Sequence, residues 1–201
     1  MNSRTEPVVV LDAGHGPAGT GSNHMGACYN GLVEAALTWE TCQRMKHSIP
    51  SVNGWLHMTR PTPWDTPSLQ ARADIANGLK ASFFLSVHYN AVSHAGPCGI
   101  ETLYCMGSAK GELAAKAFQA SLVRQTGARD RGLVPRGDLV VLKNTKCPAV
   151  LVELGFLSNP YEAALIRSEI YQQAICQGLI NGLWDALRAI GALPDTRPGS
   201  V

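Results

Sequence analysis

The sequence predicts an α/β domain with a mainly parallel, twisted sheet of about six strands flanked by helices. Short apolar runs, typical of strands buried on both faces, alternate with longer segments in which apolar residues recur at helical spacing. Such alternation favours parallel pairing, because the helix returns the chain to the edge where the previous strand began. The chain has 201 residues, 45% hydrophobic and 16% charged, so we expect one domain with one apolar core.

Six apolar segments are predicted to form the strands. The first contains the run from Val8 to Leu11, and the third contains the run from Phe83 to Val87, both rich in β-branched or aromatic residues. Each run is bounded by turn-forming residues and is too short for an ordinary helix. The predicted strands cover residues 7–12, 55–58, 83–87, 99–104, 139–142 and 149–154.

Five segments are predicted to form helices. In the first, Leu32, Ala35 and Trp39 recur at helical spacing and Pro50 follows the end of the pattern. Gly127 similarly ends the third helix. The predicted helices cover residues 32–48, 68–80, 108–127, 160–167 and 168–190. A Gly-rich loop is predicted over 14–31. The single domain is expected to span 1–201, with a core from about 7 to 190 and a loose tail at 194–201.

Charge and composition exclude several classes of function. A net charge of +2, with no run of Lys and Arg, is too mild for a nucleic-acid-binding protein. No apolar run approaches the roughly 18 residues of a membrane span, and no signal peptide is visible. The six cysteines form no C-x-x-C pair and are predicted to be reduced. We therefore expect a monomer that is made in the cytoplasm.

Chemically active side chains follow three of the predicted strands. His15 lies just beyond the first strand, His88 ends the third, and Glu153 lies near the end of the last. Ligands bind open parallel sheets at the carboxyl ends of the strands. If these three strands are parallel neighbours, the three side chains gather at one edge of the sheet.

Two histidines and a carboxylate suit a catalytic zinc site, which leaves one coordination position open for water. Hydrolysis also needs a second carboxylate to move a proton. Glu34 supplies it, because the first helix begins near the carboxyl end of the strand that precedes it. Glu40 lies almost two turns further along the same helix and is expected to point elsewhere.

Three motifs in this order resemble a known family. They are Val-Leu-Asp-Ala-Gly-His-Gly at 10–16, Ser-Val-His-Tyr-Asn-Ala at 86–91 and Val-Glu-Leu-Gly-Phe-Leu-Ser-Asn at 152–159. Together they look like the catalytic domain of the zinc-dependent N-acetylmuramoyl-L-alanine amidases, which include cell-separation amidases and phage endolysins. The resemblance extends from residue 8 to about 187.

The resemblance implies roles for the four residues. His15, Glu34 and His88 correspond to the family's Zn²⁺ ligands, and Glu153 corresponds to its catalytic glutamate. The implied substrate is peptidoglycan, cleaved between the lactyl group of muramic acid and the L-alanine of the stem peptide. Such an enzyme would act on the cell wall after release or export.

The sequence also departs from the family pattern. Pro17 stands where a second glycine usually follows the His-Gly pair, and the loop between His15 and Glu34 is longer than usual. In autoinhibited members a helix inserted after the second histidine plugs the site. Only residues 91–97 separate that motif from the next strand here, which implies an open enzyme similar to an endolysin.

Other interpretations remain open at this stage. A zinc peptidase acting on cell-wall peptides would use the same ligand types, although no His-x-x-Glu pair is present. A non-catalytic wall-binding module would be expected to lack Glu153 or a ligand. Asn90 is a candidate support for the site. Several further polar side chains are considered weaker candidates for substrate contact or are assigned no role: His24, His47, His57, His94, Arg72, Lys143 and Asn144.

Overall fold

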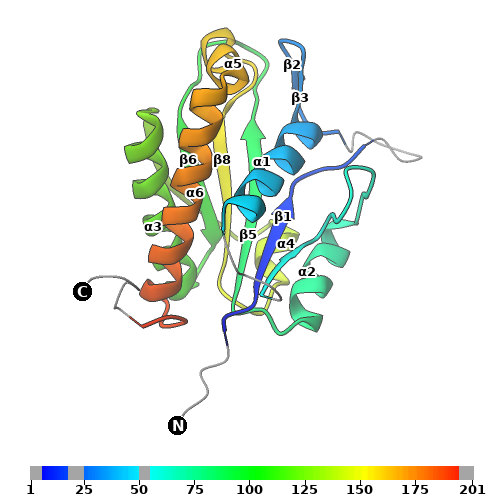
Figure 1. The fold of residues 1–201 in the computed structure, drawn as a ribbon, viewed down its shortest axis with the longest axis vertical. Coiled ribbons are helices and arrows are strands. Elements are labelled where there is room, and N and C mark those ends of the chain that lie inside the picture. Colours follow the sequence, from blue (N-terminus) through cyan, green and yellow to red (C-terminus); the bar gives the residue numbers. More distant parts are fainter. Residues whose placement is uncertain (1–5, 18–24, 50–54, 195–201) are drawn as a thin grey trace.

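The computed structural model describes residues 6–17, 25–49 and 55–194 of the chain. It shows one α/β domain in which a central sheet is covered by helices on both faces (Figure 1). The tail predicted to be loose lies almost wholly outside the described residues, as does His24.

The main sheet has six strands in the order β4-β1-β5-β8-β6-β7. Four of its five pairings are parallel, and only β6 and β8 are antiparallel, which confirms the predicted fold class. The strands are β1 (Val9–Ala13), β4 (Leu56–Met58), β5 (Phe83–Asn90), β6 (Ile100–Cys105), β7 (Asp130–Arg136) and β8 (Ala149–Phe156). A separate hairpin is formed by β2 (Cys28–Tyr29) and β3 (Leu32–Val33).

The helices begin and end where the sequence supplies capping groups. The side chains of Ser68, Ser108 and Asn159 each accept a backbone N–H bond at a helix start, and Gly127 ends α3 in the left-handed conformation. The helices are α1 (Glu34–Ser48), α2 (Leu69–Gly78), α3 (Ala109–Thr126), α4 (Val140–Lys143), α5 (Pro160–Arg167) and α6 (Glu169–Ala189). No helix in these described ranges is both long and apolar enough to cross a membrane.

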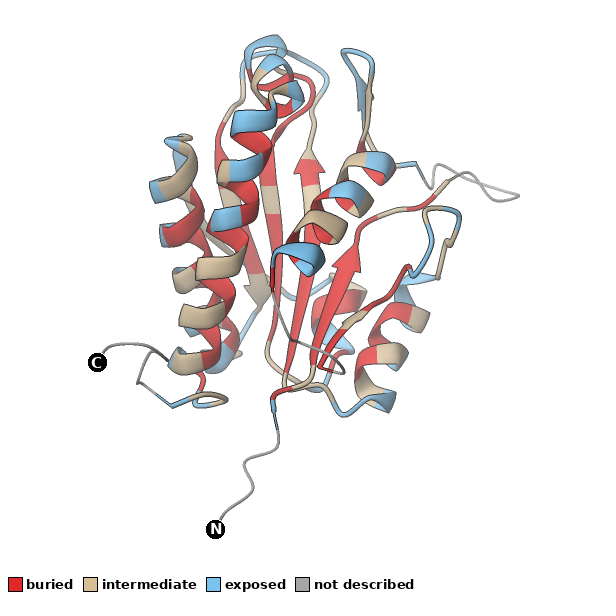
Figure 2. Ribbon diagram, viewed as in Figure 1, coloured by how far each residue is buried: buried red, intermediate tan, exposed pale blue. Residues whose placement is uncertain are grey.

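Alternate residues of the strands face two separate cores. On β1, Val9 and Leu11 belong to the larger core under α1, α3 and α6, whereas Val10 belongs to the smaller core beside α2 and α4. This alternation is the two-residue period of a strand. Figure 2 shows the resulting buried layer between the helices. Because helices cover both faces of the sheet, a ligand can meet the sheet at the ends of its strands.

One predicted strand is wrong, and one strand of the main sheet was missed, as was the short β2–β3 hairpin. Residues 139–142 form the short helix α4, with Val141 and Leu142 buried. A four-residue apolar run has no period that distinguishes a strand from a buried helical turn. The missed strand of the main sheet, β7, contains Gly132 and Pro135 and has no buried residue. Its position at the edge of the sheet explains both features, because an edge strand tolerates proline.

Candidate metal centre

β1, β5 and β8 are parallel neighbours, so their carboxyl ends meet at one edge of the sheet. This arrangement is the one that the sequence predicted. The β2–β3 hairpin stands at the same edge and leads directly into α1 (Figure 1). The three segments that carry His15, Glu34 and His88 therefore converge there.

His15 is held in an unusual backbone conformation just beyond β1. Its φ angle is 60°, in the left-handed region that residues with a side chain rarely adopt. The preceding Gly14 donates its N–H to the carbonyl of Val87 over 3.0 Å. A Cβ atom at Gly14 would lie 2.3 Å from the Cε1 atom of His88. The glycine therefore allows the backbone before His15 to pass against the imidazole of His88.

Glu34 is the first residue of α1 and is almost fully buried. Its Oε1 atom lies 2.9 Å from Nδ1 of His88 and 3.2 Å from Nε2 of His15. Its Oε2 atom accepts the N–H of Ala27 over 2.8 Å. Gly26 has a φ angle of 70°, and a Cβ atom there would approach Oε2 to 2.4 Å. The start of the hairpin thus fixes one carboxylate oxygen and leaves the other facing the two histidines.

Burial alone would raise the pKa of Glu34. The hydrogen bonds and charges of His15 and His88 outweigh that effect and hold the pKa below its ordinary value. The start of a helix also favours a carboxylate over a carboxylic acid. Glu34 is therefore an anion whose Oε1 atom faces two imidazole nitrogens and also accepts the backbone N–H of Tyr89 over 3.2 Å.

His15, Glu34 and His88 form a group that could hold a metal ion. One potential ligand atom from each residue lies within 4.8 Å of the other two. Two imidazoles and a carboxylate are the ligand set of many catalytic zinc sites. The chemistry and convergence of these donors fit such an ion.

Glu153 lies beside this group on β8. It is the register partner of His88 on β5 and of Glu101 on β6. Its Oε2 atom is buried and has no hydrogen-bond partner among the described residues. Burial, together with the charges of Glu34 and Glu101, raises the pKa of Glu153 well above its ordinary value. Such a carboxyl can exchange a proton nearer neutrality than an exposed glutamate does.

A buried ion pair between Arg72 and Asp12 supports the loop that carries His15. Arg72 donates from Nη1 to Oδ1 of Asp12 over 2.6 Å and to the carbonyl of Ala13 over 2.8 Å. Its Nη2 atom donates to the carbonyl of His15 over 2.6 Å. Arg72 therefore holds the chain at three points between Asp12 and His15, the last of them the residue with the left-handed φ angle.

Arg60 adds a second support that links this loop to α1. Its Nη1 atom donates to the carbonyls of Gly14 over 3.1 Å and Ala35 over 3.0 Å. Ala35 follows Glu34, so one guanidinium joins the segments that carry two of the three candidate ligands. The sequence interpretation missed this residue, and it considered Arg72 only as a solvated or paired side chain.

The remaining candidates fall into two groups. Asn90 lies close to the centre and donates to Oε1 of Glu101 over 3.0 Å, so it supports the neighbour of Glu153. Asn144 instead bonds Asn77 and Gln70, near the start of β8 at the opposite edge of the sheet. Lys143 ends α4 in the same region. These last two residues do not belong to the centre.

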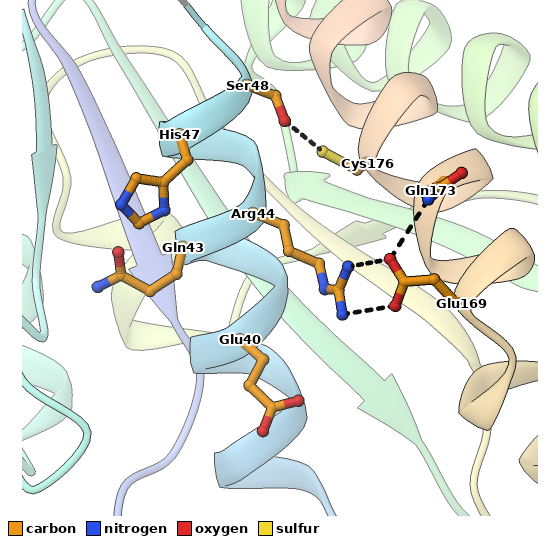
Figure 3. Close-up of a pocket in the computed structure, with 8 residues that line it drawn as sticks. All are labelled: Glu40, Gln43, Arg44, His47, Ser48, Glu169, Gln173 and Cys176. Atoms are coloured by element: carbon orange, nitrogen blue, oxygen red, sulfur yellow. Dashed lines mark hydrogen bonds and ion pairs between the residues drawn. The ribbon is translucent and has the colours of Figure 1, made fainter.

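A groove between α1 and α6 lies away from this edge of the sheet (Figure 3). Arg44 on α1 forms two hydrogen bonds with Glu169 on α6, at 2.6 and 2.8 Å. Glu40 also lines this groove, which confirms that it points away from Glu34. His47 lines it too. The groove has a volume of about 490 Å³ and is open to solvent, and none of the candidate ligands lies in it.

The fold and the centre together define an α/β domain with a His-Glu-His group and a further glutamate at one edge of its sheet. The chain belongs to the N-acetylmuramoyl-L-alanine amidase family, whose model matches residues 9–185. This result confirms the family resemblance seen in the three sequence motifs.

Individual relatives agree with this assignment. The chain is 31% identical over 187 residues to the N-acetylmuramoyl-L-alanine amidase LytC of Bacillus subtilis, covering 90% of this chain and 36% of LytC. It is 32% identical to the endolysin of Bacillus phage SPP1, covering 90% of this chain and 66% of the endolysin. The chain therefore corresponds to only part of each relative.

Solved structures show the same fold. The catalytic domain of CwlV, an N-acetylmuramoyl-L-alanine amidase from Bacillus (Paenibacillus) polymyxa var. colistinus, superposes with a TM-score of 0.81 at 28% identity. The match covers 91% of this chain and 99% of that domain. The described architecture is thus that of an amidase catalytic domain.

Proposed function

We propose that this chain is a zinc-dependent peptidoglycan amidase that cleaves the bond between the lactyl group of N-acetylmuramic acid and L-alanine. The observation that carries the proposal is the convergence of His15, Glu34 and His88 at one edge, with Glu153 beside them. Family membership and the amidase relatives support the substrate assignment.

In this proposal His15 and His88 hold the zinc ion through one imidazole nitrogen each, and Glu34 through a carboxylate oxygen. When bound, the ion supplies a Lewis acid that polarises a carbonyl and lowers the pKa of a bound water to about 7. The hydrogen bond from Ala27 to Oε2 of Glu34 orients the carboxylate, and such supporting contacts matter for metal affinity.

Glu153 is the proposed proton carrier. Its carboxylate takes a proton from the water that attacks the lactyl carbonyl carbon and delivers it to the nitrogen of the departing L-alanine. The C–N bond then breaks, so the water's oxygen remains on the lactyl group as a carboxylate and the stem peptide leaves with a free amine. A raised pKa suits this role because the group must both accept and release the proton.

The site is proposed to be open and unregulated. Residues 91–99 alone connect β5 to β6, and they contain no helix. No plugging segment of the inserted-helix type therefore stands between His88 and the next strand. This short connection favours an enzyme that resembles an endolysin rather than an autoinhibited amidase.

The proposal is tested by digesting purified peptidoglycan with the purified chain and determining the products by mass. We expect intact stem peptides with free L-alanine amines, separate from the glycan strands. Trimmed stem peptides would instead indicate the zinc peptidase alternative. Metal content measured on the same sample should show one zinc per chain. Chelation with EDTA should abolish release, and added zinc should restore it; activity that survives complete metal removal contradicts the zinc proposal.

A further inference from the structure

Trp64 is far more exposed than the other tryptophans in the described residues. Its exposed fraction is 79%, whereas Trp55 is 5% exposed and Trp39 and Trp184 pack against the larger core. Tryptophan is enriched at binding interfaces, because its large ring contributes much of the contact energy. Exposure alone does not identify a ligand, so the surroundings of the indole decide what it can bind.

The segment that presents Trp64 is held in place on both sides of the indole. Arg60 is 1% exposed and donates to the carbonyls of Pro63 and Asp65, each over 2.9 Å. The carboxylate of Asp65 accepts the backbone N–H and the hydroxyl of Thr62 over 2.7 and 2.8 Å. These contacts order the backbone before any ligand arrives, which lowers the entropic cost of binding.

The same segment packs against the loop that carries His15. Arg60 also donates to the carbonyl of Gly14, and the hydroxyl of Thr66 donates to the carbonyl of Pro17 over 2.9 Å. The segment follows β4, which is the neighbour of β1 on the side away from β5. The segment that carries Trp64 therefore lies beside the His15 loop, on the side of β1 away from β5.

The proposed substrate has two parts, a glycan strand and a stem peptide, and the charge of the segment distinguishes between them. Residues 61–67 read Pro-Thr-Pro-Trp-Asp-Thr-Pro, so their only charged side chain is Asp65. Stem peptides carry carboxylates, and this segment offers them no cation because Arg60 is buried and bonded to carbonyls. A sugar ring is neutral and presents C–H groups on its faces, which pack against the face of an indole.

We propose that Trp64 forms a subsite for the glycan strand, stacking on the sugar next to the muramic acid whose amide is cleaved. This inference depends on the proposed function for its substrate class. Trp64 binds substrate in this scheme and takes no part in proton transfer.

Steady-state kinetics test the subsite. Trp64→Ala should raise KM for muramoyl-peptides on glycan strands by about three- to tenfold, the range expected for loss of one aromatic stacking partner, while kcat changes little. The rise should be smaller for a muramoyl-peptide that carries a single sugar, and Trp64→Phe should restore part of the affinity. Met106→Ala is the matched control, because Met106 is also exposed (63%) but follows β6 at the opposite edge. Equal KM values for Trp64→Ala and wild type would overturn the subsite.

Binding of peptide-free glycan strands tests the inference without catalysis. These strands lack the scissile bond, so the wild-type chain can be titrated directly while its tryptophan fluorescence is recorded. We expect glycan strands to change the tryptophan fluorescence of the wild-type chain. This change should be absent in Trp64→Phe, and free stem peptides should not produce it. A response to stem peptides alone would overturn the assignment to glycan. If wild type releases no stem peptide from walls, the proposed function fails, whereas this titration still reports on Trp64.

Discussion

Glu153 lies between a histidine and a second glutamate on the two neighbouring strands. His88 lies beside it on one neighbouring strand and Glu101 on the other. Glu101 is paired with Arg131, whose Nε lies 2.9 Å from Oε2 of Glu101, and also accepts a hydrogen bond from Asn90. Both side-chain oxygens of Glu101 thus have a partner, whereas Oε2 of Glu153 has none in the described structure. This difference supports the proposal that Glu153, rather than Glu101, carries the proton.

Glu153→Gln should reduce amide hydrolysis by about 10²- to 10⁴-fold, the usual contribution of a positioned acid–base group. The amide retains the shape of the side chain but cannot carry the proton. Stem-peptide release and zinc content should be measured together, and zinc content should remain at the wild-type level. Glu169→Gln, in the groove between α1 and α6, is the matched control and should retain activity. Unchanged hydrolysis by Glu153→Gln contradicts the proposed mechanism.

At the scale of elements, the centre depends on how closely β1 approaches β5 beyond their last paired residues. Gly14 lies against the ring of His88, while Arg72 and Arg60 hold the carbonyls that follow β1. Gly26 and Ala27, which lead into β2, position the carboxylate of Glu34 in a similar way. The candidate ligands are therefore positioned mainly by backbone segments with little freedom to move.

Gly14→Ala should displace the imidazole of His88, because the new methyl group would lie 2.3 Å from its Cε1 atom. We expect zinc affinity to fall by about 10- to 100-fold, the range seen when the support of a ligand is lost. Competition with a chromogenic chelator measures this directly. Gly137→Ala is the control, since no atom lies within 4 Å of a Cβ atom there. Wild-type zinc affinity in Gly14→Ala would show that the close approach is unimportant.

The element boundaries show where local patterns succeed. The continuous apolar runs of β1, β5 and β8, the capped and periodic segments of α2 and α3, and the apolar period of α6 are encoded within a few residues of themselves. The first helix is predicted from residue 32 but begins at Glu34, because Leu32 and Val33 pair with β2. The edge strand β7 was not predicted because its own residues, which include Gly132 and Pro135, give no strand pattern. It becomes a strand by pairing with β6.

For the molecule as a whole, a buried polar network ties the site to global stability. Asp12, beneath the His15 loop, bonds Arg72, Thr59 and Ser86. Burial alone would raise the pKa of Asp12, but the Arg72 charge and the hydroxyl bonds hold it below the ordinary value of 3.8. A carboxylate with a lowered pKa stabilises the fold above its ordinary pKa, and this contribution is lost as the pH falls through the folded value.

Asp12→Asn should therefore lower the free energy of unfolding at about pH 7 by about 3 kcal/mol, because Arg72 remains buried without its counter-charge. The difference from wild type should shrink below about pH 4, where Asp12 begins to bind a proton in the unfolded state. Urea unfolding at several pH values measures both effects. Asp138→Asn, at an exposed pair with Arg136, should leave stability unchanged. A pH-independent deficit in Asp12→Asn would argue against the ion pair as its cause.

The sequence by itself determined the class of fold and the four residues assigned to the centre. Its apolar periods define most strands and helices, and the motifs at 10–16, 86–91 and 152–159 mark the strand ends that matter. Parallel topology then implies a common edge without any coordinates. The predicted fold class is confirmed because it depends on short-range pattern and on a general rule of parallel sheets, whereas the roles of the four residues stay predictions.

Only the tertiary structure decided how that edge is built. The antiparallel pairing that brings Glu101 beside Glu153, the contacts of Arg60 and Arg72 beneath the His15 loop, and the packing of the Trp64 segment all join residues distant in sequence. No local period encodes such pairings, because they arise when separate elements close on one another. The sequence therefore supplied the chemical groups, and the packing of the chain set their distances and environments.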